Sequence, residues 1–368
     1  MAGRLVALDL PGGPAFVDAL RAVWDRGDAA LPVDQRLPRA ALALLLDAMR
    51  PSSVVDAQGD ESLLPDGRPT DDGDALVVAT SGTTATPKGV VLTHAAVAAS
   101  AVASSARLGV IADDHWLACL PLSHVGGLSV VTRALHTGAR LTVLAGFDVD
   151  EVERSGATLI SLVSTALRRI DASLFRRILL GGAGPPPDLP PNVVTTYGMT
   201  ETGSGVVYDG FPLDGVELRI SAGEVHIRCP MLFRCYRDGT SPLVDGWFAT
   251  GDAAHLDASG ALVVEGRIDE LIITGGENVW PQAVEAVLSE HPAVRDVAVA
   301  GRPDAEWGEV VVAYVVAGGT PPSLDELRDH VKVSLPAYNA PRLLVLVEEV
   351  PRTALGKIVR TVFRHPGR

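Results

Sequence analysis

The sequence is poor in positive charge. It has 31 lysines and arginines against 45 aspartates and glutamates, a net charge of −14, and an isoelectric point of about 5.0. A protein whose main partner is nucleic acid needs a basic face for the phosphates. This balance argues against nucleic acid as the main partner, but it is compatible with small anionic substrates.

Cysteine is scarce as well. The three cysteines, Cys119, Cys229 and Cys235, have no spacing typical of a metal site or a disulfide framework. We therefore expect a reduced, cytoplasmic protein.

Long apolar runs are missing. No stretch approaches the ~18 uninterrupted apolar residues of a membrane span. The first residues also lack the apolar segment of a signal peptide. We expect neither a membrane span nor a signal peptide.

The remaining composition is that of an ordinary globular protein, with 47% hydrophobic and 21% charged residues among 368. A chain of this length has room for two or three domains, each with a full core, at roughly 100–200 residues per domain.

Helical and strand patterns alternate over the first two hundred residues. Helical spacing of apolar residues predicts helices over 14–26, 38–50 and 126–136, and Thr93 is a good N-cap for another over 94–106. Short apolar runs predict strands at 75–79, 117–120, 140–144, 159–163 and 178–180. Residues 52–73, rich in Asp, Gly, Pro and Ser, are predicted to form a loop. The alternation predicts an α/β fold with mostly parallel sheets.

The pattern changes twice further along the chain. Short strands with Gly and Asp turns over about 216–265 predict a small barrel-like section. After Gly266, helices at 281–290 and 323–334 and strands at 294–300, 309–316 and 343–347 predict a compact α+β unit. We place the boundary near residue 268, with a large N-terminal domain over 1–268 and a small C-terminal domain over 269–368.

The most informative segment follows the strand at 75–79 directly. It reads Thr80-Ser81-Gly82-Thr83-Thr84-Ala85-Thr86-Pro87-Lys88-Gly89. Glycine and small hydroxyl residues let backbone N–H groups approach phosphate oxygens, and Lys88 adds a positive charge. It is not a Walker loop, because Pro87 precedes the lysine and Gly89 follows it. This order favours a phosphate loop over a solvated turn.

These residues resemble the signature loop of the adenylate-forming superfamily, which includes acyl-CoA synthetases, peptide-synthetase adenylation domains and beetle luciferases. The resemblance implies ATP and CoA as substrates, Mg²⁺ as cofactor, and a small C-terminal domain that moves. The family usually has glycine in place of Ala85. If that position needs a positive φ, alanine costs on the order of 1 kcal/mol. The implied nucleotide-binding residues of the loop are Thr80, Ser81, Gly82, Thr83 and Thr84.

A second segment, Tyr197-Gly198-Met199-Thr200-Glu201, resembles the adenine and magnesium segment of the family. By that resemblance Tyr197 stacks on adenine, Thr200 contacts phosphate and Glu201 binds Mg²⁺, a cation that prefers carboxylate oxygens. Gly198 belongs to the same nucleotide-binding segment. The residues Gly181, Gly182 and Ala183 match the family's Gly-Gly-Ala turn, which lies along the nucleotide.

A third group of residues resembles the family's ribose site and hinge. Asp252 ends the segment 247–252 and would accept hydrogen bonds from both ribose hydroxyls. The resemblance implies that Arg267 contacts ribose and phosphate. It also makes Asp269 the hinge between the domains, at the boundary that composition alone suggests.

The family carries out two half-reactions in one pocket. In the first, a carboxylate attacks the α-phosphorus of ATP, and Lys88, Lys357 and the Mg²⁺ on Glu201 would screen the repulsion between the anions. Lys357 resembles the catalytic lysine of the family through its context in 351–357.

In the second half-reaction the small domain would rotate about Asp269. The resemblance implies that Gly275, Gly276 and Glu277 then form a slot for the pantetheine arm of CoA. His124, in segment 120–128, would lie at the acyl pocket. A purely structural histidine fits that position equally well.

Within the family, segments 120–128 and 197–202 look most like those of the o-succinylbenzoate–CoA ligases of menaquinone biosynthesis. That substrate is a dianion, so we expect an uncompensated donor or arginine at the acyl pocket, with Arg168 and Arg169 as candidates by position alone. Three alternatives stay open: another aryl- or medium-chain acyl-CoA synthetase, an amino-acid adenylating enzyme, and a nucleotide-binding relic without turnover. A homo-oligomer is compatible with the sequence.

Overall fold

The computed structural model describes residues 3–80, 87–182, 184, 188–352 and 358–364. The chain divides into two compact units. Unit 1 comprises Met1–Leu218 and Ile227–Phe248, and unit 2 comprises Arg219–His226 and Ala249–Arg368. The two units are defined by how densely their residues contact one another. The predicted boundary between functional domains near residue 268 therefore stays a prediction.

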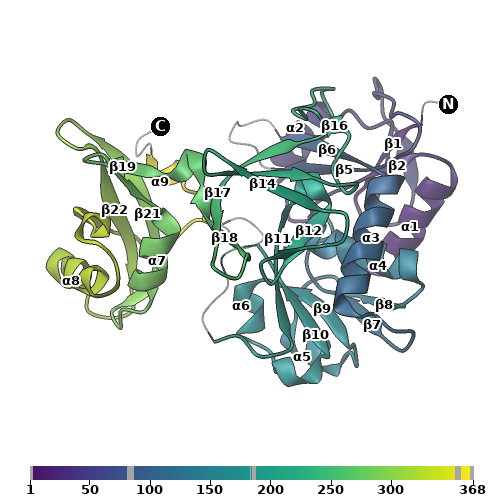
Figure 1. Ribbon diagram of the computed structural model, residues 1–368. Helices are drawn as coiled ribbons and strands as arrows, with labels where there is room; N and C mark the ends of the chain where they lie inside the picture. Colours follow the sequence, from purple (N-terminus) through teal and green to yellow (C-terminus); the bar gives the residue numbers. More distant parts are fainter. Residues whose placement is uncertain (1–2, 81–86, 183, 185–187, 353–357, 365–368) are drawn as a thin grey trace. The chain divides into compact units, whose positions relative to one another are not determined.

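A seven-stranded sheet forms one half of unit 1, in the order β16-β6-β5-β2-β1-β3-β4 (Figure 1). Its strands are β1 (Leu5–Leu8), β2 (Ala29–Pro32), β3 (Ser53–Val55), β4 (Glu61–Leu63), β5 (Asp74–Thr80), β6 (Lys88–Thr93) and β16 (Cys235–Tyr236). The central strands β5, β2, β1 and β3 are parallel, whereas the outer strands pair antiparallel.

The predicted loop over 52–73 is partly wrong, because β3 and β4 form an antiparallel pair there. Each of these strands has only three residues, too few for a periodic pattern to show. The two predicted helices beside this sheet are confirmed as α1 (Pro14–Asp25) and α2 (Arg39–Met49).

A second seven-stranded sheet has the order β13-β12-β11-β10-β9-β7-β8. Its strands are β7 (His115–Ala118), β8 (Arg140–Val143), β9 (Leu159–Leu162), β10 (Arg177–Leu180), β11 (Val193–Met199), β12 (Ser204–Tyr208) and β13 (Phe211–Pro212). The five strands from β8 to β11 are parallel, and β12 and β13 add an antiparallel edge. The prediction of an α/β fold with mostly parallel sheets is confirmed.

Helices α3 (His94–Leu108) and α4 (Val125–Thr137) lie between the two sheets (Figure 1). Thr93 caps α3 as predicted, since its hydroxyl accepts a hydrogen bond from the N–H of Ala96 at 3.1 Å. The helices α5 (Val149–Arg154) and α6 (Ser164–Leu167) share a separate apolar core with the second sheet.

The predicted barrel-like section is a four-stranded sheet with β14 and β18 at its edges. Its strands are β14 (Glu217–Ser221), β15 (Glu224–Arg228), β17 (Phe248–Leu256) and β18 (Leu262–Arg267).

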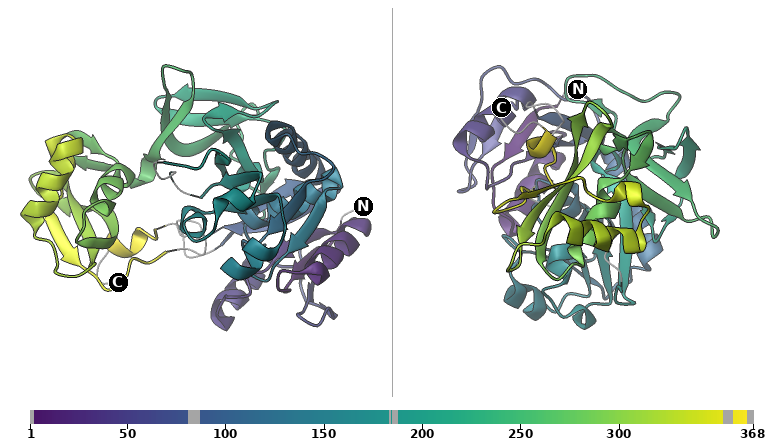
Figure 2. Two further views of the ribbon diagram at one scale, coloured as in Figure 1. Left: turned by 90° about the horizontal axis from the view of Figure 1, so that it is seen from below. Right: turned by 90° about the vertical axis from the view of Figure 1, so that its left-hand side faces the viewer.

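The rest of unit 2 is a five-stranded sheet with helices on both faces (Figure 2). Side chains alternate along its central strands: Val297 and Val299 face α7 and α8, whereas Ala298 and Ala300 face α9. The elements are β19 (Ile272–Thr274), β20 (Glu277–Val279), β21 (Val294–Asp304), β22 (Gly308–Ala317), β23 (Leu343–Leu346), α7 (Pro281–Ser289), α8 (Leu324–Ser334) and α9 (Thr361–Arg364). The predicted α+β unit is confirmed.

Candidate active site

The nucleotide-binding residues predicted in unit 1 lie at or near the ends of strands. Thr80 is the last residue of β5, Gly181 follows β10, and Tyr197 and Gly198 lie near the end of β11. In open α/β sheets, ligands bind in the crevice beyond the carboxyl ends of parallel strands. The arrangement of β10 and β11 therefore suits a nucleotide site at this edge.

The phosphate loop joins β5 to β6. Thr80 and Lys88 are directly paired across the two antiparallel strands, so the two ends of the loop meet. The hydroxyl of Thr80 donates to the carbonyl of Lys88 at 3.4 Å. The other predicted phosphate contacts (Ser81, Gly82, Thr83 and Thr84) and Ala85 lie outside the described residues.

The glycines at the strand ends lie close to neighbouring atoms of the chain and leave no room for a Cβ. A Cβ on Gly198 would lie 2.2 Å from the carbonyl oxygen of Ser204, and one on Gly181 would lie 2.8 Å from the hydroxyl of Thr196. Gly182 has a φ of 93°, which favours glycine. Ala183 lies outside the described residues. Gly181 and Gly198 are therefore required by the packing of β11 and β12 around them, because a larger residue would collide with Thr196 or with the backbone of Ser204.

Glu201 lies in a single 3₁₀ turn, η2 (Thr200–Thr202), which brings it next to Thr200. The buried hydroxyl of Thr202 stabilises this turn by accepting from the N–H of Met199 at 3.0 Å and donating to the carbonyl of Ser204 at 2.7 Å. The carboxylate of Glu201 accepts a hydrogen bond from the hydroxyl of Tyr236 at 3.0 Å.

The donor set fits Mg²⁺ brought in with ATP. Over the described part of the chain, no three His, Cys, Asp or Glu side chains converge into a metal cage. Mg²⁺ is commonly held by one or two carboxylates together with substrate phosphates. A single carboxylate, Glu201, therefore suits this metal.

In unit 2, Asp252 and Arg267 face each other on β17 and β18. The Nη1 of Arg267 donates to the carbonyl of Thr250 at 2.7 Å and lies 3.4 Å from Asp252 Oδ1, and its Nε donates to Asp269 at 3.2 Å. Burial lowers the pKa of Arg267, but Asp252 and Asp269 outweigh this effect and raise it. The predicted ribose residues and the predicted hinge thus form one charged group.

Gly275 and Gly276 form the two-residue turn of the β19–β20 hairpin, and Glu277 begins β20. Both glycines have positive φ, 61° and 85°, as such hairpin turns require. A Cβ on Gly275 would lie 2.8 Å from the ring of Trp307. The turn is therefore restricted to glycine for structural reasons, whatever its role in CoA binding.

His124 precedes α4 and is mostly buried. Its Nε2 has no hydrogen-bond partner among the described residues and lies 4.0 Å from Asp34 Oδ2. Burial lowers the pKa of His124, and Asp34 opposes this. Arg36 holds that aspartate through hydrogen bonds of 2.8 and 2.7 Å. The lowered pKa favours the neutral imidazole near pH 7, with its Nε2 buried and without a hydrogen-bond partner among the described residues.

Lys357 lies outside the described residues. The chain on either side of it is joined by a bridge between Arg352 and Ile358 and by a hydrogen bond from the N–H of Val359 to the carbonyl of Pro351 at 2.9 Å.

Comparison with known proteins supports the same chemistry. Residues 56–237 match the model of the AMP-binding enzymes, and residues 283–357 match the model of the AMP-binding enzyme C-terminal domain. The chain belongs to the family of AMP-binding enzymes.

The relatives of this AMP-binding enzyme include a probable 2-succinylbenzoate–CoA ligase from Mycobacterium tuberculosis. The two are 43% identical over 367 residues, covering 87% of this chain and 94% of the relative. A solved o-succinylbenzoate CoA synthetase from Bacillus subtilis, in complex with its acyl-adenylate intermediate, has a TM-score of 0.88 and 29% identity over 99% of this chain and 88% of that one. The same enzyme with ATP and a magnesium ion has a TM-score of 0.85 and 29% identity over 98% and 89%. The family and fold expected from the sequence are confirmed.

Sequence reasoning missed two residues of this AMP-binding enzyme. Tyr236 contacts Glu201 only because β16 pairs with β6 across a long stretch of chain. Arg133 is buried in α4, with the residue 2% exposed, where a helix pattern predicts an apolar residue. No local motif marks either position.

Proposed function

We propose that this enzyme is an ATP-dependent 2-succinylbenzoate–CoA ligase. One carboxylate of the acid attacks the α-phosphorus of ATP, the bond to pyrophosphate breaks, and an acyl-adenylate forms. The thiol of CoA then attacks the acyl carbonyl, the bond to AMP breaks, and the thiol proton passes to solvent. The second carboxylate stays ionised throughout, so the pocket needs a cation for it.

The observation that carries the acid specificity is Arg133. Its guanidinium donates to the hydroxyls of Ser104 at 2.9 Å and Ser204 at 2.6 Å, and it lies 5.3 Å from the ring of Trp116. A third hydroxyl, that of Tyr208, lies 3.5 Å from its Nη2; no carboxylate pairs with the guanidinium among the described residues, and its Nη1 has no hydrogen-bond partner there. A buried guanidinium cannot lose its charge and is costly without an anion. It is therefore suited to a carboxylate supplied by the substrate.

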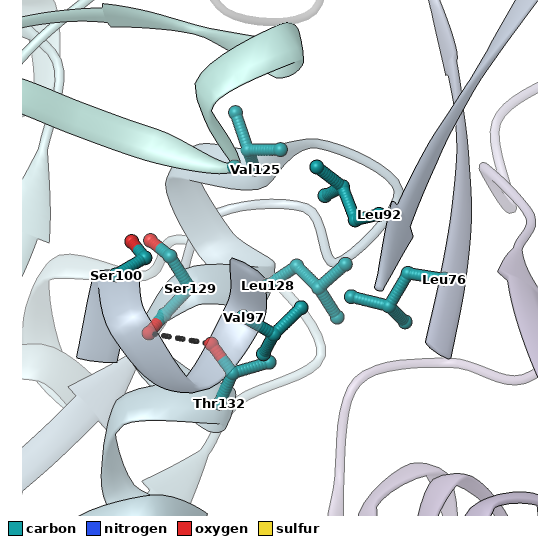
Figure 3. A pocket seen from close by; sticks show the side chains of 9 residues that line it. Leu76, Leu92, Val97, Ser100, Val125, Leu128, Ser129 and Thr132 are labelled. Carbon is teal, nitrogen blue, oxygen red and sulfur yellow. Dashed lines mark hydrogen bonds between the residues drawn. The ribbon is translucent and has the colours of Figure 1, made fainter. Parts of the chain in front are cut away.

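A small cavity lies beside the part of α4 that carries Arg133, although Arg133 itself does not line it. Ser129 and Thr132 of α4 line this cavity together with Val125 and Gly203 (Figure 3). Val125 follows His124, and Gly203 lies two residues after Glu201. The cavity is thus lined by residues close in sequence to the predicted acyl residue and to the predicted metal ligand, although neither of those two lines it. It has room for about one water molecule, so lining side chains have to move to admit an acyl group.

The two arginines suggested by sequence position alone are less suitable than Arg133 for binding the second carboxylate of the acid. Arg168 and Arg169 are both exposed, and the guanidinium of Arg169 lies 5.1 Å from the ring of Phe147. Ion pairing at exposed sites is weak.

The test measures CoA-dependent AMP formation with 2-succinylbenzoate, benzoate, a medium-chain fatty acid and several amino acids. We expect turnover with 2-succinylbenzoate. In Arg133→Gln, its KM should rise about 10- to 100-fold, while the KM for ATP stays constant and the exposed control Arg169→Gln behaves like the wild type. Preference for a monoanionic acid, or an unchanged KM in a folded Arg133→Gln, would contradict the proposal. If no acid supports AMP formation, the result would favour the alternative of a nucleotide-binding protein without turnover.

Within the described residues, no helix is both long and apolar enough to cross a membrane. Location in the cytoplasm and homo-oligomerisation stay predictions, with sedimentation of the purified protein as the measurement for the second.

A further inference from the structure

The short strand β16 connects the two charged residues predicted to act on the phosphates and the metal. Just before it, the N–H of Phe233 donates to the carbonyl of Glu201 at 2.8 Å. Just after it, the N–H of Arg237 donates to the carbonyl of Gly89 at 2.6 Å, next to Lys88. One segment of the chain therefore holds both backbones.

The side chain of Tyr236 repeats this connection. Its hydroxyl donates to Glu201 Oε1 at 3.0 Å. Its ring centroid lies 5.3 Å from the Nζ of Lys88, within the range of a cation–π contact. Tyr236 is half-buried, and its ring packs 4.9 Å from that of Phe233. A single phenol thus contacts an anion and a cation from distant parts of the sequence.

Arg237 anchors this strand to the first sheet. Its buried guanidinium donates to the carbonyl of Met49 at 2.9 Å, to that of Pro69 at 2.8 Å, and to that of Arg68. Burial lowers the pKa of Arg237 to about 10, so the side chain stays charged near neutral pH. The backbone that carries Tyr236 is therefore held in place independently of any ligand.

We propose that Tyr236 is a positioning residue for Mg²⁺-ATP. Its hydroxyl holds Glu201 Oε1 and leaves the second carboxylate oxygen for the metal, while its ring holds Lys88 beside the phosphate loop. This inference rests on the proposed function only in requiring ATP and Mg²⁺, not a particular acid.

Two effects of the hydroxyl oppose each other. Donation to Oε1 withdraws some negative charge from the carboxylate, which weakens its attraction for Mg²⁺. Fixing the side chain removes the rotamer entropy that a free glutamate would lose on binding. Removing groups that orient metal ligands typically costs 10- to 100-fold in affinity. The gain from orienting Glu201 therefore outweighs the charge withdrawn from its carboxylate. Because Tyr236 is partly exposed, we expect a loss of metal affinity near the lower limit of this range, about tenfold.

The experiment is calorimetric titration of ATP into the full chain without acid or CoA, at a series of Mg²⁺ concentrations and with excess EDTA. Tyr236→Phe removes the hydroxyl but keeps the ring over Lys88. We expect it to weaken Mg²⁺-ATP binding about tenfold and to leave metal-free ATP binding within twofold. Tyr236→Leu also removes the ring, so it should weaken binding in EDTA as well. The matched control is Tyr314→Phe in unit 2, whose hydroxyl donates to the carbonyl of Phe363.

A double variant separates orientation from a general structural effect. In a Glu201→Gln background, Tyr236→Phe should change Mg²⁺-ATP affinity by less than about twofold, because the metal ligand is already lost. A tenfold loss in both backgrounds, or wild-type affinity in a folded Tyr236→Phe, overturns the proposal. Failure of the ligase proposal would show only in the acid panel and leave these titrations unchanged.

Discussion

Single buried side chains give this protein properties that their residue types do not predict. Glu285, on α7, accepts hydrogen bonds from the N–H of Val299 at 2.7 Å and from Arg360 at 2.5 Å. Burial nevertheless raises the pKa of Glu285 to about 7, although Arg360 and the Val299 N–H act in the opposite direction. The folded protein thus holds this proton more tightly than the unfolded chain, where a glutamate has a pKa of about 4.3.

The first prediction concerns pH. Between about pH 4.3 and 7 the folded state binds more protons at Glu285 than the unfolded state, so stability falls as pH rises. Glu285→Gln removes this dependence. The melting temperature of the variant minus that of the wild type should increase from pH 5 to pH 7 and stay constant above about pH 8. Thermal unfolding across this range is the measurement, and parallel curves for the two proteins would contradict it.

At the scale of elements, Arg360 joins three parts of unit 2. It is 6% exposed and immediately precedes α9. Its Nη1 donates to Glu270 of the 3₁₀ turn η3 (Ile268–Glu270) at 3.0 Å, its Nη2 to Glu285 of α7, and its Nε to the carbonyl of Val299 in β21 at 3.2 Å. The residue next to the predicted hinge is thus fixed to the core of unit 2.

At about pH 8, above the pKa of Glu285, we expect Arg360→Met to destabilise unit 2 by up to about 3–5 kcal/mol, because Glu270 and Glu285 then stay buried without a cation or have to take up a proton. Denaturant unfolding measures this, with Arg295→Met at an exposed position as the control. Adding Glu270→Gln and Glu285→Gln to Arg360→Met should restore part of the loss. A loss below about 1 kcal/mol would mean that the carboxylates find other partners.

At the scale of the whole molecule, the two half-reactions should be separable. We predict that Lys357→Ala lowers adenylate formation about 100-fold or more and affects thioester formation from added acyl-adenylate far less. Gly275→Ala should do the reverse, because its new Cβ would meet the ring of Trp307 and its φ of 61° is unfavourable for alanine.

Pyrophosphate–ATP exchange measures the first half-reaction, and thioester release from supplied adenylate measures the second. Equal losses of both rates in each variant would mean that Lys357 and Gly275 act on folding or on a shared step. Melting temperatures of the variants distinguish these two explanations.

The sequence by itself determined the family and most local structure. Thr93 caps α3 and the Gly275-Gly276 turn closes a hairpin because these features depend on backbone preferences of a few neighbouring residues. The phosphate loop and the segment 197–201 have the same local character, so their order along the chain sufficed to predict the chemistry. The short strands β3 and β4 escaped prediction because three residues carry too little periodic signal.

Only the tertiary structure decided which distant charges meet. Tyr236 reaches Glu201 through the pairing of β16 with β6, and Arg133 is enclosed by hydroxyls from α3 and β12. Neither contact follows from local preference, because each depends on segments brought together by burial of apolar surface. The same burial decides whether a charge is neutralised, exposed or left available for a ligand, and a one-dimensional pattern does not contain that information.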